Sequence, residues 1–168
     1  ERTSLLRETT KALSQANAQL KIQATLDPLT GLANRRHLFE VAHHHAVKGD
    51  IVSVLVADLD HFKRINDAHG HHVGDAVLID FAELLRDEIG QAEFGFSPNS
   101  GLAARYGGEE FVVLLFNVSL PQLEAFGERI VTLARARSVA QTKHLPASAL
   151  AEDHDVIRYT ASVGLVLG

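Results

Sequence analysis

The sequence has no cysteine, no methionine and no tryptophan among its 168 residues, and only 4 prolines. The absence of cysteine excludes disulfide bonds, thiolate nucleophiles and cysteine-bound zinc. No apolar run approaches the roughly 20 residues of a membrane-spanning helix, and from these residues we expect no signal peptide. Because the chain begins at Glu1 and contains no methionine, we expect it to be part of a longer protein.

Basic residues are also in short supply, with 16 Lys and Arg against 21 Asp and Glu and a net charge of −5. Proteins that bind nucleic acids or anionic membranes need a basic face, so this balance favours neither partner. The hydrophobic fraction of 46% and charged fraction of 22% are typical of a globular domain. A chain of this length buries roughly 70% of its unfolded surface, enough to fold without a disulfide or a metal.

Residues 1–26 predict a helix that lies outside the main core. Apolar, small or polar residues recur along one side of it at steps of four and three: Leu6, Thr10, Leu13, Asn17, Leu20 and Ala24. This heptad-like seam predicts a two-chain coiled-coil linker, and the alternative is a solvated helix that caps the domain. We expect the helix to end at Asp27-Pro28, because the residue before a proline avoids the helical region.

The rest of the chain predicts helices at residues 35–48, 73–89 and 120–139, and strands at residues 51–57, 102–106, 109–116 and 156–167. Residues 51–57 are continuously apolar and rich in β-branched side chains, which is typical of a central strand buried on both faces. Gly107-Gly108 predicts a hairpin whose turn needs positive φ angles. Residues 140–155 form a polar insertion with no predicted function.

Two groups of carboxylates are candidates for a functional site. Asp58 and Asp60 follow the central strand at its carboxyl end, where open α/β sheets place ligands. If the strand stays extended, both side chains point to the same face, where like charges need a cation between them. The alternative is that these carboxylates cap the next helix.

The second group is Glu109-Glu110, beside the predicted hairpin turn. Adjacent glutamates cost stability unless a metal ion or catalysis requires them, and the alternative is a solvated hairpin protected by charge. If the hairpin lies beside the central strand, the glutamates converge with Asp58. Carboxylate oxygens suit Mg²⁺ or Mn²⁺, the usual partners of a nucleoside triphosphate. Such a site suits metal-assisted nucleotidyl transfer.

These motifs resemble the GGDEF family of diguanylate cyclase domains. Gly107-Gly108-Glu109-Glu110-Phe111 is similar to the GGEEF form of its signature, and Arg105-Tyr106 precede it. Residues 27–36 (DPLTGLANRR) resemble the family's amino-terminal motif. Its central motif is matched by DLDHFK at residues 58–63, IND at 65–67, GH at 70–71 and GD at 74–75. The resemblance covers about residues 25–168.

The resemblance implies an α+β fold of the polymerase-palm or nucleotide-cyclase kind, with a mixed, mainly antiparallel sheet flanked by helices and an N-terminal helix. It implies a diguanylate cyclase that uses Mg²⁺ or Mn²⁺ to condense two GTP into cyclic di-GMP and two pyrophosphates. Each domain would hold one GTP, so a homodimer with facing sites is expected, paired by residues 1–26. An upstream sensor, a cytoplasmic location and a parent protein that is soluble or membrane-anchored are also expected.

By position, the resemblance implies catalytic and metal-binding roles for five residues. Asp58, the backbone carbonyl of Leu59 and one of Glu109 and Glu110 would hold the metal. Glu109 or Glu110 would be the base for the attacking 3′-hydroxyl group. Lys63 would stabilise the charge that develops on the phosphate.

The resemblance also implies a nucleotide-binding group. Asn66 and Asp75 would read guanine, since they offer the donor and acceptor atoms that a base edge requires. His71 and Phe62 would help to bind the nucleotide. The Gly107-Gly108 turn would pack close to it, because glycines leave room for a ligand.

Three departures from the family pattern affect the expected function. Pro98 and Gly101 occupy the positions of the inhibitory Arg-x-x-Asp motif, so we expect no product inhibition through that site. The insertion at residues 140–155 is longer than usual. The family's final helix, with phosphate-binding basic residues, and its last strand are absent after Gly168, so we expect part of the phosphate site and an edge strand to be lacking.

Two other functions remain open at this stage. One is a catalytically silent GGDEF domain that binds GTP as a regulatory ligand or serves in dimerisation. The other is a metal-binding module built on histidines at residues 43–45, 69, 71 and 72. The histidine pattern lacks cysteine and a clear ligand spacing, so it favours solvated side chains over a zinc site.

Overall fold

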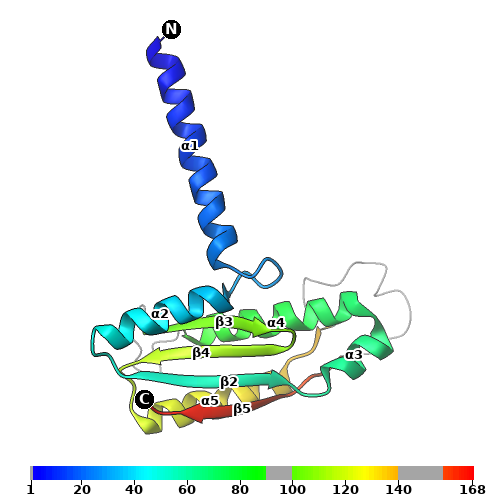
Figure 1. Cartoon of the computed structure of the whole chain (residues 1–168). Helices are drawn as coiled ribbons and strands as arrows, with labels where there is room; N and C mark the ends of the chain where they lie inside the picture. Colours follow the sequence, from blue (N-terminus) through cyan, green and yellow to red (C-terminus); the bar gives the residue numbers. More distant parts are fainter. Residues whose placement is uncertain (1, 90–99, 140–156) are drawn as a thin grey trace.

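The computed structural model describes residues 2–89, 100–139 and 157–168 (Figure 1). The helices are α1 (Arg2–Thr25), α2 (Arg35–Val47), α3 (Phe62–His69), α4 (His71–Ile89) and α5 (Leu120–Ala136). The strands are β1 (Ala33–Asn34), β2 (Val52–Leu59), β3 (Gly101–Gly107), β4 (Glu110–Phe116) and β5 (Ala161–Val166). Two features of the sequence analysis lie outside the described residues. They are the insertion at residues 140–155 and Pro98, which stands at the first position of the inhibitory motif.

The five strands form one sheet in the order β1-β3-β4-β2-β5. β1 is parallel to β3, while the β3–β4, β4–β2 and β2–β5 pairs are antiparallel. The prediction of a mixed, mainly antiparallel sheet flanked by helices is therefore confirmed. β2 is a central strand, as its apolar run predicts.

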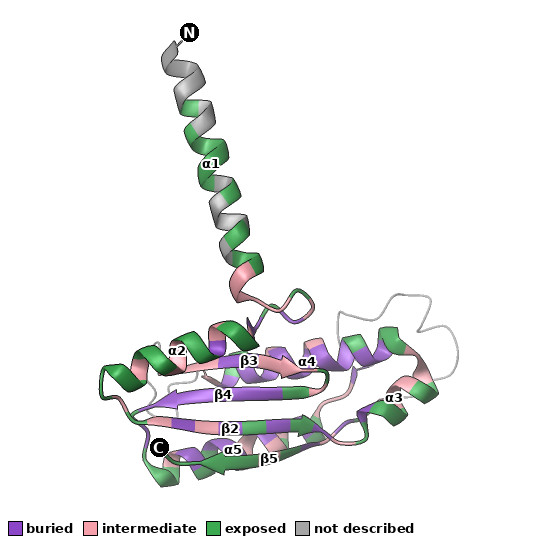
Figure 2. Ribbon diagram, viewed as in Figure 1, coloured by how far each residue is buried: buried purple, intermediate pink, exposed green. Residues whose placement is uncertain are grey.

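Alternation along β2 divides the core into two layers (Figure 2). Leu55, Ala57 and Leu59 are fully buried and belong to the larger cluster, which includes residues of α4 and α5. Val52 and Val54 point to the other face, where they pack against the cluster that includes Leu38 of α2. Towards the carboxyl end of β2 this second face is exposed at Val56 and Asp58, so the prediction of burial on both faces is wrong there, and the open face makes room for a ligand.

The N-terminal helix stands away from the sheet and its helices (Figure 1). Leu13 and Leu20 of its seam are 63% and 61% exposed. The helix ends at Thr25, as Asp27-Pro28 predicts. No helix within the described part of the chain is both long and apolar enough to cross a bilayer.

Two predicted element boundaries are wrong by three residues or more, and the predicted conformation of one turn is also wrong. α5 stops at Ala136, because Arg137 is extended and its side chain reaches back to α4. β5 begins at Ala161 rather than residue 156. The hairpin glycines do not have positive φ angles, which among the described glycines occur at Gly31, Gly49 and Gly70. The turn consists of Gly108 and Glu109, because Gly107 already pairs with Glu110, and a register shift between Arg105 and Gly107 lies just before it.

A buried polar network joins α4 to the segments that follow α5 and precede β5. Asp80 of α4 is 3% exposed and accepts a hydrogen bond from the Tyr159 hydroxyl at 2.5 Å. The Arg137 guanidinium donates to the same carboxylate at 3.1 Å. Burial raises the pKa of Tyr159 well above its usual range, and the bond to Asp80 raises it further. Tyr159 is therefore a neutral donor at any physiological pH.

We expect Asp80→Ala to lower the free energy of unfolding by about 3–5 kcal/mol, because it removes the carboxylate that accepts from the buried Tyr159 hydroxyl and balances the Arg137 charge. Urea unfolding followed by circular dichroism measures the change. Asp87→Ala is the matched control, since Asp87 also faces Arg137, at 4.0 Å, but its side chain is 64% exposed. Its loss is expected to stay below about 1 kcal/mol. Equal losses for the two variants would show that the buried network stabilises the fold no more than an exposed ion pair does.

Candidate functional site

The candidate site is centred on two carboxylates that face each other across neighbouring strands. The antiparallel register of β2 and β4 pairs Asp58 with Glu110, and both residues are exposed. Directly opposite residues on antiparallel strands point to the same face, with Cβ atoms about 5 Å apart. Glu109 is the next residue in the turn, and its carbonyl accepts the Leu59 N–H at 3.3 Å. The sequence-predicted convergence of Asp58 with the glutamate pair is therefore present.

Asp60 takes a different role from that suggested by its spacing to Asp58. β2 ends at Leu59, and the Asp60 carboxylate accepts hydrogen bonds from the hydroxyls of Thr160 and Ser162, both at 2.6 Å. The bonds from Ser162 and Thr160 lower the pKa of Asp60, so it stays ionised. Asp60 fastens the end of β2 to the start of β5. The two aspartates do not act as a pair.

The residues around Asp58 fit a hard divalent cation. Among the described residues, no hydrogen bond or ion pair involves the side chains of Asp58, Glu109 or Glu110. Like charges directly opposite each other destabilise a sheet unless something neutralises them. The donors available are carboxylate and carbonyl oxygens, which Mg²⁺ and Mn²⁺ prefer. No preformed group of three or more metal-ligating side chains occurs in the described part of the chain.

The hairpin turn beside these carboxylates is open. A Cβ atom added at Gly108 would meet nothing within 4 Å, and one at Gly107 would lie 3.3 Å from a carboxylate oxygen of Glu110. The Glu110 side chain therefore lies over Gly107. Because neither glycine has a side chain, a ligand can approach both the backbone of the turn and the Glu110 carboxylate.

The expected nucleotide-binding residues gather on α3 and α4. Asn66 of α3 lies so close to Gly74 of α4 that a Cβ atom there would be 2.0 Å from its Oδ1 atom. Asp75 follows Gly74 and is exposed. Asn66 therefore lies beside the residue that precedes Asp75, and their joint role in reading guanine stays a prediction. His71 lies one turn before Asp75 on the same helix.

Two further predicted residues occupy the start of α3. Phe62 is buried (7% exposed) and belongs to the main core, and its ring also lies beside Gly74 of α4. Lys63 is exposed beside it and has no described partner, which leaves its ammonium group available to an anion. His61, just before the helix, has a positive φ of 56°, and the chain turns there from β2 into α3.

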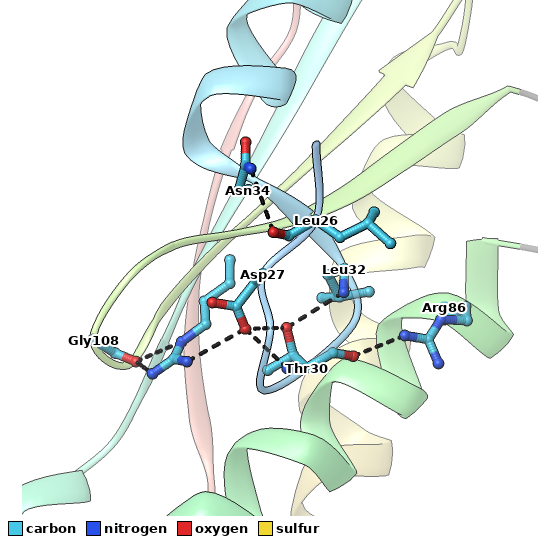
Figure 3. Close-up of polar contacts among 8 residues, drawn as sticks. Leu26, Asp27, Thr30, Leu32, Asn34, Arg86 and Gly108 are labelled. Carbon is cyan, nitrogen blue, oxygen red and sulfur yellow. Dashed lines mark hydrogen bonds and ion pairs between the residues drawn. The ribbon is translucent and has the colours of Figure 1, made fainter. Parts of the chain in front are cut away.

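A polar brace connects the end of α1 to the signature turn (Figure 3). The Asp27 carboxylate accepts hydrogen bonds from the Thr30 N–H at 2.9 Å and the Thr30 hydroxyl at 2.7 Å, and pairs with Arg105 at 3.4 Å. Arg105 also donates to the Gly108 carbonyl at 3.0 and 2.7 Å. Burial opposes ionisation of Asp27, but the Thr30 bonds and the Arg105 charge outweigh it and lower its pKa.

The same joint holds the last turn of α1 by its backbone. Asn34 donates from its side-chain amide to the carbonyls of Ala24 at 3.0 Å and Leu26 at 3.4 Å. Arg86 of α4 donates to the Thr30 carbonyl at 2.9 Å (Figure 3). Sequence reasoning placed these residues in motifs without finding this brace. An acidic residue and an arginine 78 positions apart give no sequence signal of their contact.

Comparison with known protein families finds one model that matches most of the chain. The family described as "Diguanylate cyclase, GGDEF domain" matches residues 24–162. Diguanylate cyclase DgcP of Pseudomonas aeruginosa is 42% identical over 135 residues, which are 77% of this chain and 19% of that protein. Diguanylate cyclase A of Treponema denticola is 34% identical over 135 residues, 76% of this chain and 34% of that protein. The chain thus spans between about a fifth and a third of these relatives.

Related proteins also differ in their named activities. Cyclic di-GMP phosphodiesterase PdeR of Escherichia coli is 39% identical over 123 residues, 72% of this chain and 17% of that protein. Among solved structures, the coiled coil and GGDEF domain of DgcB from Caulobacter crescentus, in complex with c-di-GMP, has a TM-score of 0.79 at 25% identity. That comparison covers 98% of this chain and 80% of the other, so it includes the N-terminal helix.

Proposed function

The chain belongs to the GGDEF domain family, and from that membership we propose that it is a diguanylate cyclase that converts two GTP into cyclic di-GMP and two pyrophosphates. The observation that carries the proposal is the pairing of Asp58 with Glu110 across β2 and β4, where neither carboxylate forms an ion pair with a described residue. All the carboxylates that the family's signature supplies are present in this sequence. A silent domain that has lost them is therefore disfavoured.

The proposed reaction is a phosphoryl substitution. The 3′-hydroxyl oxygen of one GTP attacks the α-phosphorus of the other, a P–O bond forms, and the bond to pyrophosphate breaks. Pyrophosphate leaves with the bonding electron pair, while the hydroxyl proton passes to Glu109 or Glu110 as general base. The same exchange in the opposite direction closes the ring and releases the second pyrophosphate.

Asp58, the Leu59 carbonyl and one of Glu109 and Glu110 would hold a divalent cation. When bound, Mg²⁺ or Mn²⁺ would neutralise triphosphate charge and polarise the phosphate under attack. The register favours Glu110 as the glutamate that shares this duty with Asp58, because the two side chains lie on one face. Lys63 would place a positive charge beside the phosphates. These residues fix the position of the α-phosphate, which is the main requirement of such a transfer.

Guanine would be read by Asn66 and Asp75 where α3 meets α4. An amide provides both donor and acceptor atoms, and an ionised carboxylate accepts from the N1–H and amino group of guanine. Adenine lacks that pair of donors, so it would leave the Asp75 carboxylate without partners. The site would therefore discriminate against ATP.

We expect Gly74→Ala to weaken GTP binding about tenfold while the fold persists. The new Cβ atom would meet the end of the Asn66 side chain, which can rotate away but would then leave its guanine-reading position. The Cβ atom would also lie 3.2 Å from the Phe62 ring, which must shift by a few tenths of an ångström. Calorimetric titration with a non-hydrolysable GTP analogue measures the effect. Gly164→Ala is the matched control, because a Cβ atom there meets nothing within 4 Å. Equal affinity in Gly74→Ala and the unmodified chain would remove Asn66 from the site.

The direct test of the proposed activity is product formation from GTP with Mg²⁺, followed by chromatography of the nucleotides. Cyclic di-GMP that appears with Mg²⁺ and disappears with EDTA would support a metal-dependent cyclase. GTP binding without product would favour the silent regulatory domain instead. A location in the cytoplasm follows from the proposal, since the domain must meet GTP.

A further inference from the structure

A cleft lies between α3, the last turn of α5 and the residues that lead into β5. Its volume is about 790 Å³, within the range of small-molecule sites. Its walls carry Arg64 from α3, Arg135 from α5 and Arg158 from the segment before β5. None of the roles proposed above uses these three arginines.

The arginines form a local basic cluster in a chain whose net charge is −5. All three are exposed, and within the ranges that the structure describes their side chains form no ion pair or hydrogen bond. Arg137, close by in sequence, is by contrast paired with Asp80. Like charges held around one cleft repel each other, and an anion bound between them relieves the repulsion.

The wall that carries Arg135 and Arg158 is fixed to the core by its backbone. Arg158 pairs with Ser138 in a β-bridge, and the Val139 N–H donates to the Ile157 carbonyl at 3.0 Å. Tyr159, the next residue, is anchored to Asp80. The end of α5 is therefore joined by backbone hydrogen bonds to the residues before β5. These bonds hold the backbone that carries Arg135 and Arg158 in place.

One carboxylate lines the same cleft and decides which end an anion would occupy. The two oxygens of the Asp60 carboxylate accept hydrogen bonds from the hydroxyls of Thr160 and Ser162, both at 2.6 Å, which hold this acidic group at the cleft wall. It repels an anion from the end of the cleft near β2. The favourable position is the other end, among Arg64, Arg135 and Arg158.

We propose that this cleft binds a small phosphate-bearing anion through Arg64, Arg135 and Arg158. Guanidinium groups present planar pairs of N–H donors that match phosphate oxygens, and they do so better than point charges. Pyrophosphate is the probe of choice, because its several charges match three cations. Binding here does not depend on the proposed cyclase activity, since it needs neither GTP nor a metal.

The test is calorimetric titration of the full chain with sodium pyrophosphate in EDTA, so that no metal recruits the anion to Asp58. The double variant Arg135→Gln/Arg158→Gln should bind at least about tenfold more weakly. Lys11→Gln/Lys48→Gln removes the same charge from exposed positions outside the cleft, and its affinity should stay within about twofold. Urea unfolding of both variants checks that the fold is unchanged.

Parallel titrations with inorganic phosphate and with GMP identify the source of the phosphate group. Tighter binding of GMP that is lost in the arginine variant would assign the cleft to a nucleotide, and tighter binding of pyrophosphate would assign it to the inorganic anion. The proposal is overturned if the unmodified chain binds none of the three probes at millimolar concentration. It is also overturned if the arginine variant and the lysine control lose affinity equally.

Discussion

Asp58→Asn and Glu110→Gln are each expected to lower the rate of cyclic di-GMP formation by at least about 10³-fold. Each change removes one negative charge from a pair that lies directly opposite on β2 and β4, and with it a ligand for the proposed cation. Both residues are exposed, so neither change creates a cavity. Because the like-charge repulsion disappears, the free energy of unfolding should stay equal or rise slightly.

The rate is measured by chromatography of nucleotides after incubation with GTP and Mg²⁺, and stability by urea unfolding. Glu124→Gln, on the exposed surface of α5, removes the same charge from a helix that packs against the other face of β2 and should leave the rate unchanged. Full activity in either site variant, with the control also active, would remove the carboxylate pair from the mechanism.

Leu13→Glu/Leu20→Glu is expected to lower turnover about 100-fold at dilute protein and much less at high concentration. Both leucines are exposed on α1, which stands away from the sheet, so the change affects partner contacts rather than the domain's core. If two chains pair along this seam, the helix supplies a high effective concentration of the second site. Charges on the seam of a coiled coil abolish that advantage.

The matched control is Ala12→Glu/Ile22→Glu, which adds the same charges to α1 at exposed positions off the seam. Analytical ultracentrifugation should show that the seam variant shifts towards monomer and the control does not. If both variants keep the dimer and the rate, the solvated-helix interpretation of residues 1–26 is correct.

Sequence patterns predicted most of the fold because burial leaves a direct trace in them. The apolar run at residues 51–57 gave the central strand, and the spacing of the motifs gave the order of the elements. α3 was not predicted, since only Phe62 among its eight residues is buried, and its sequence is otherwise polar. β1 is two residues long and is held by pairing with β3, which no local pattern reveals.

The sequence predicted which residues belong to the candidate site but not the contacts that their side chains make. Asp58 and Asp60 look alike in sequence. In the structure, the hydroxyls of Thr160 and Ser162, about a hundred residues further along the chain, donate hydrogen bonds to Asp60 and not to Asp58. The brace between Asp27 and Arg105 likewise depends on tertiary contact. Turn statistics predicted positive φ for Gly107 and Gly108, whereas the turn consists of Gly108 and Glu109 and neither glycine has a positive φ.

The most direct test of the central claim is the dependence of cyclic di-GMP formation on protein concentration, with the full chain, GTP and Mg²⁺. A two-domain site predicts a rate that rises more steeply than linearly while dimers form, and becomes linear once they are saturated. No product at any concentration, despite bound GTP, would contradict the cyclase. A strictly linear rate down to concentrations at which ultracentrifugation shows monomers would contradict the two-domain site.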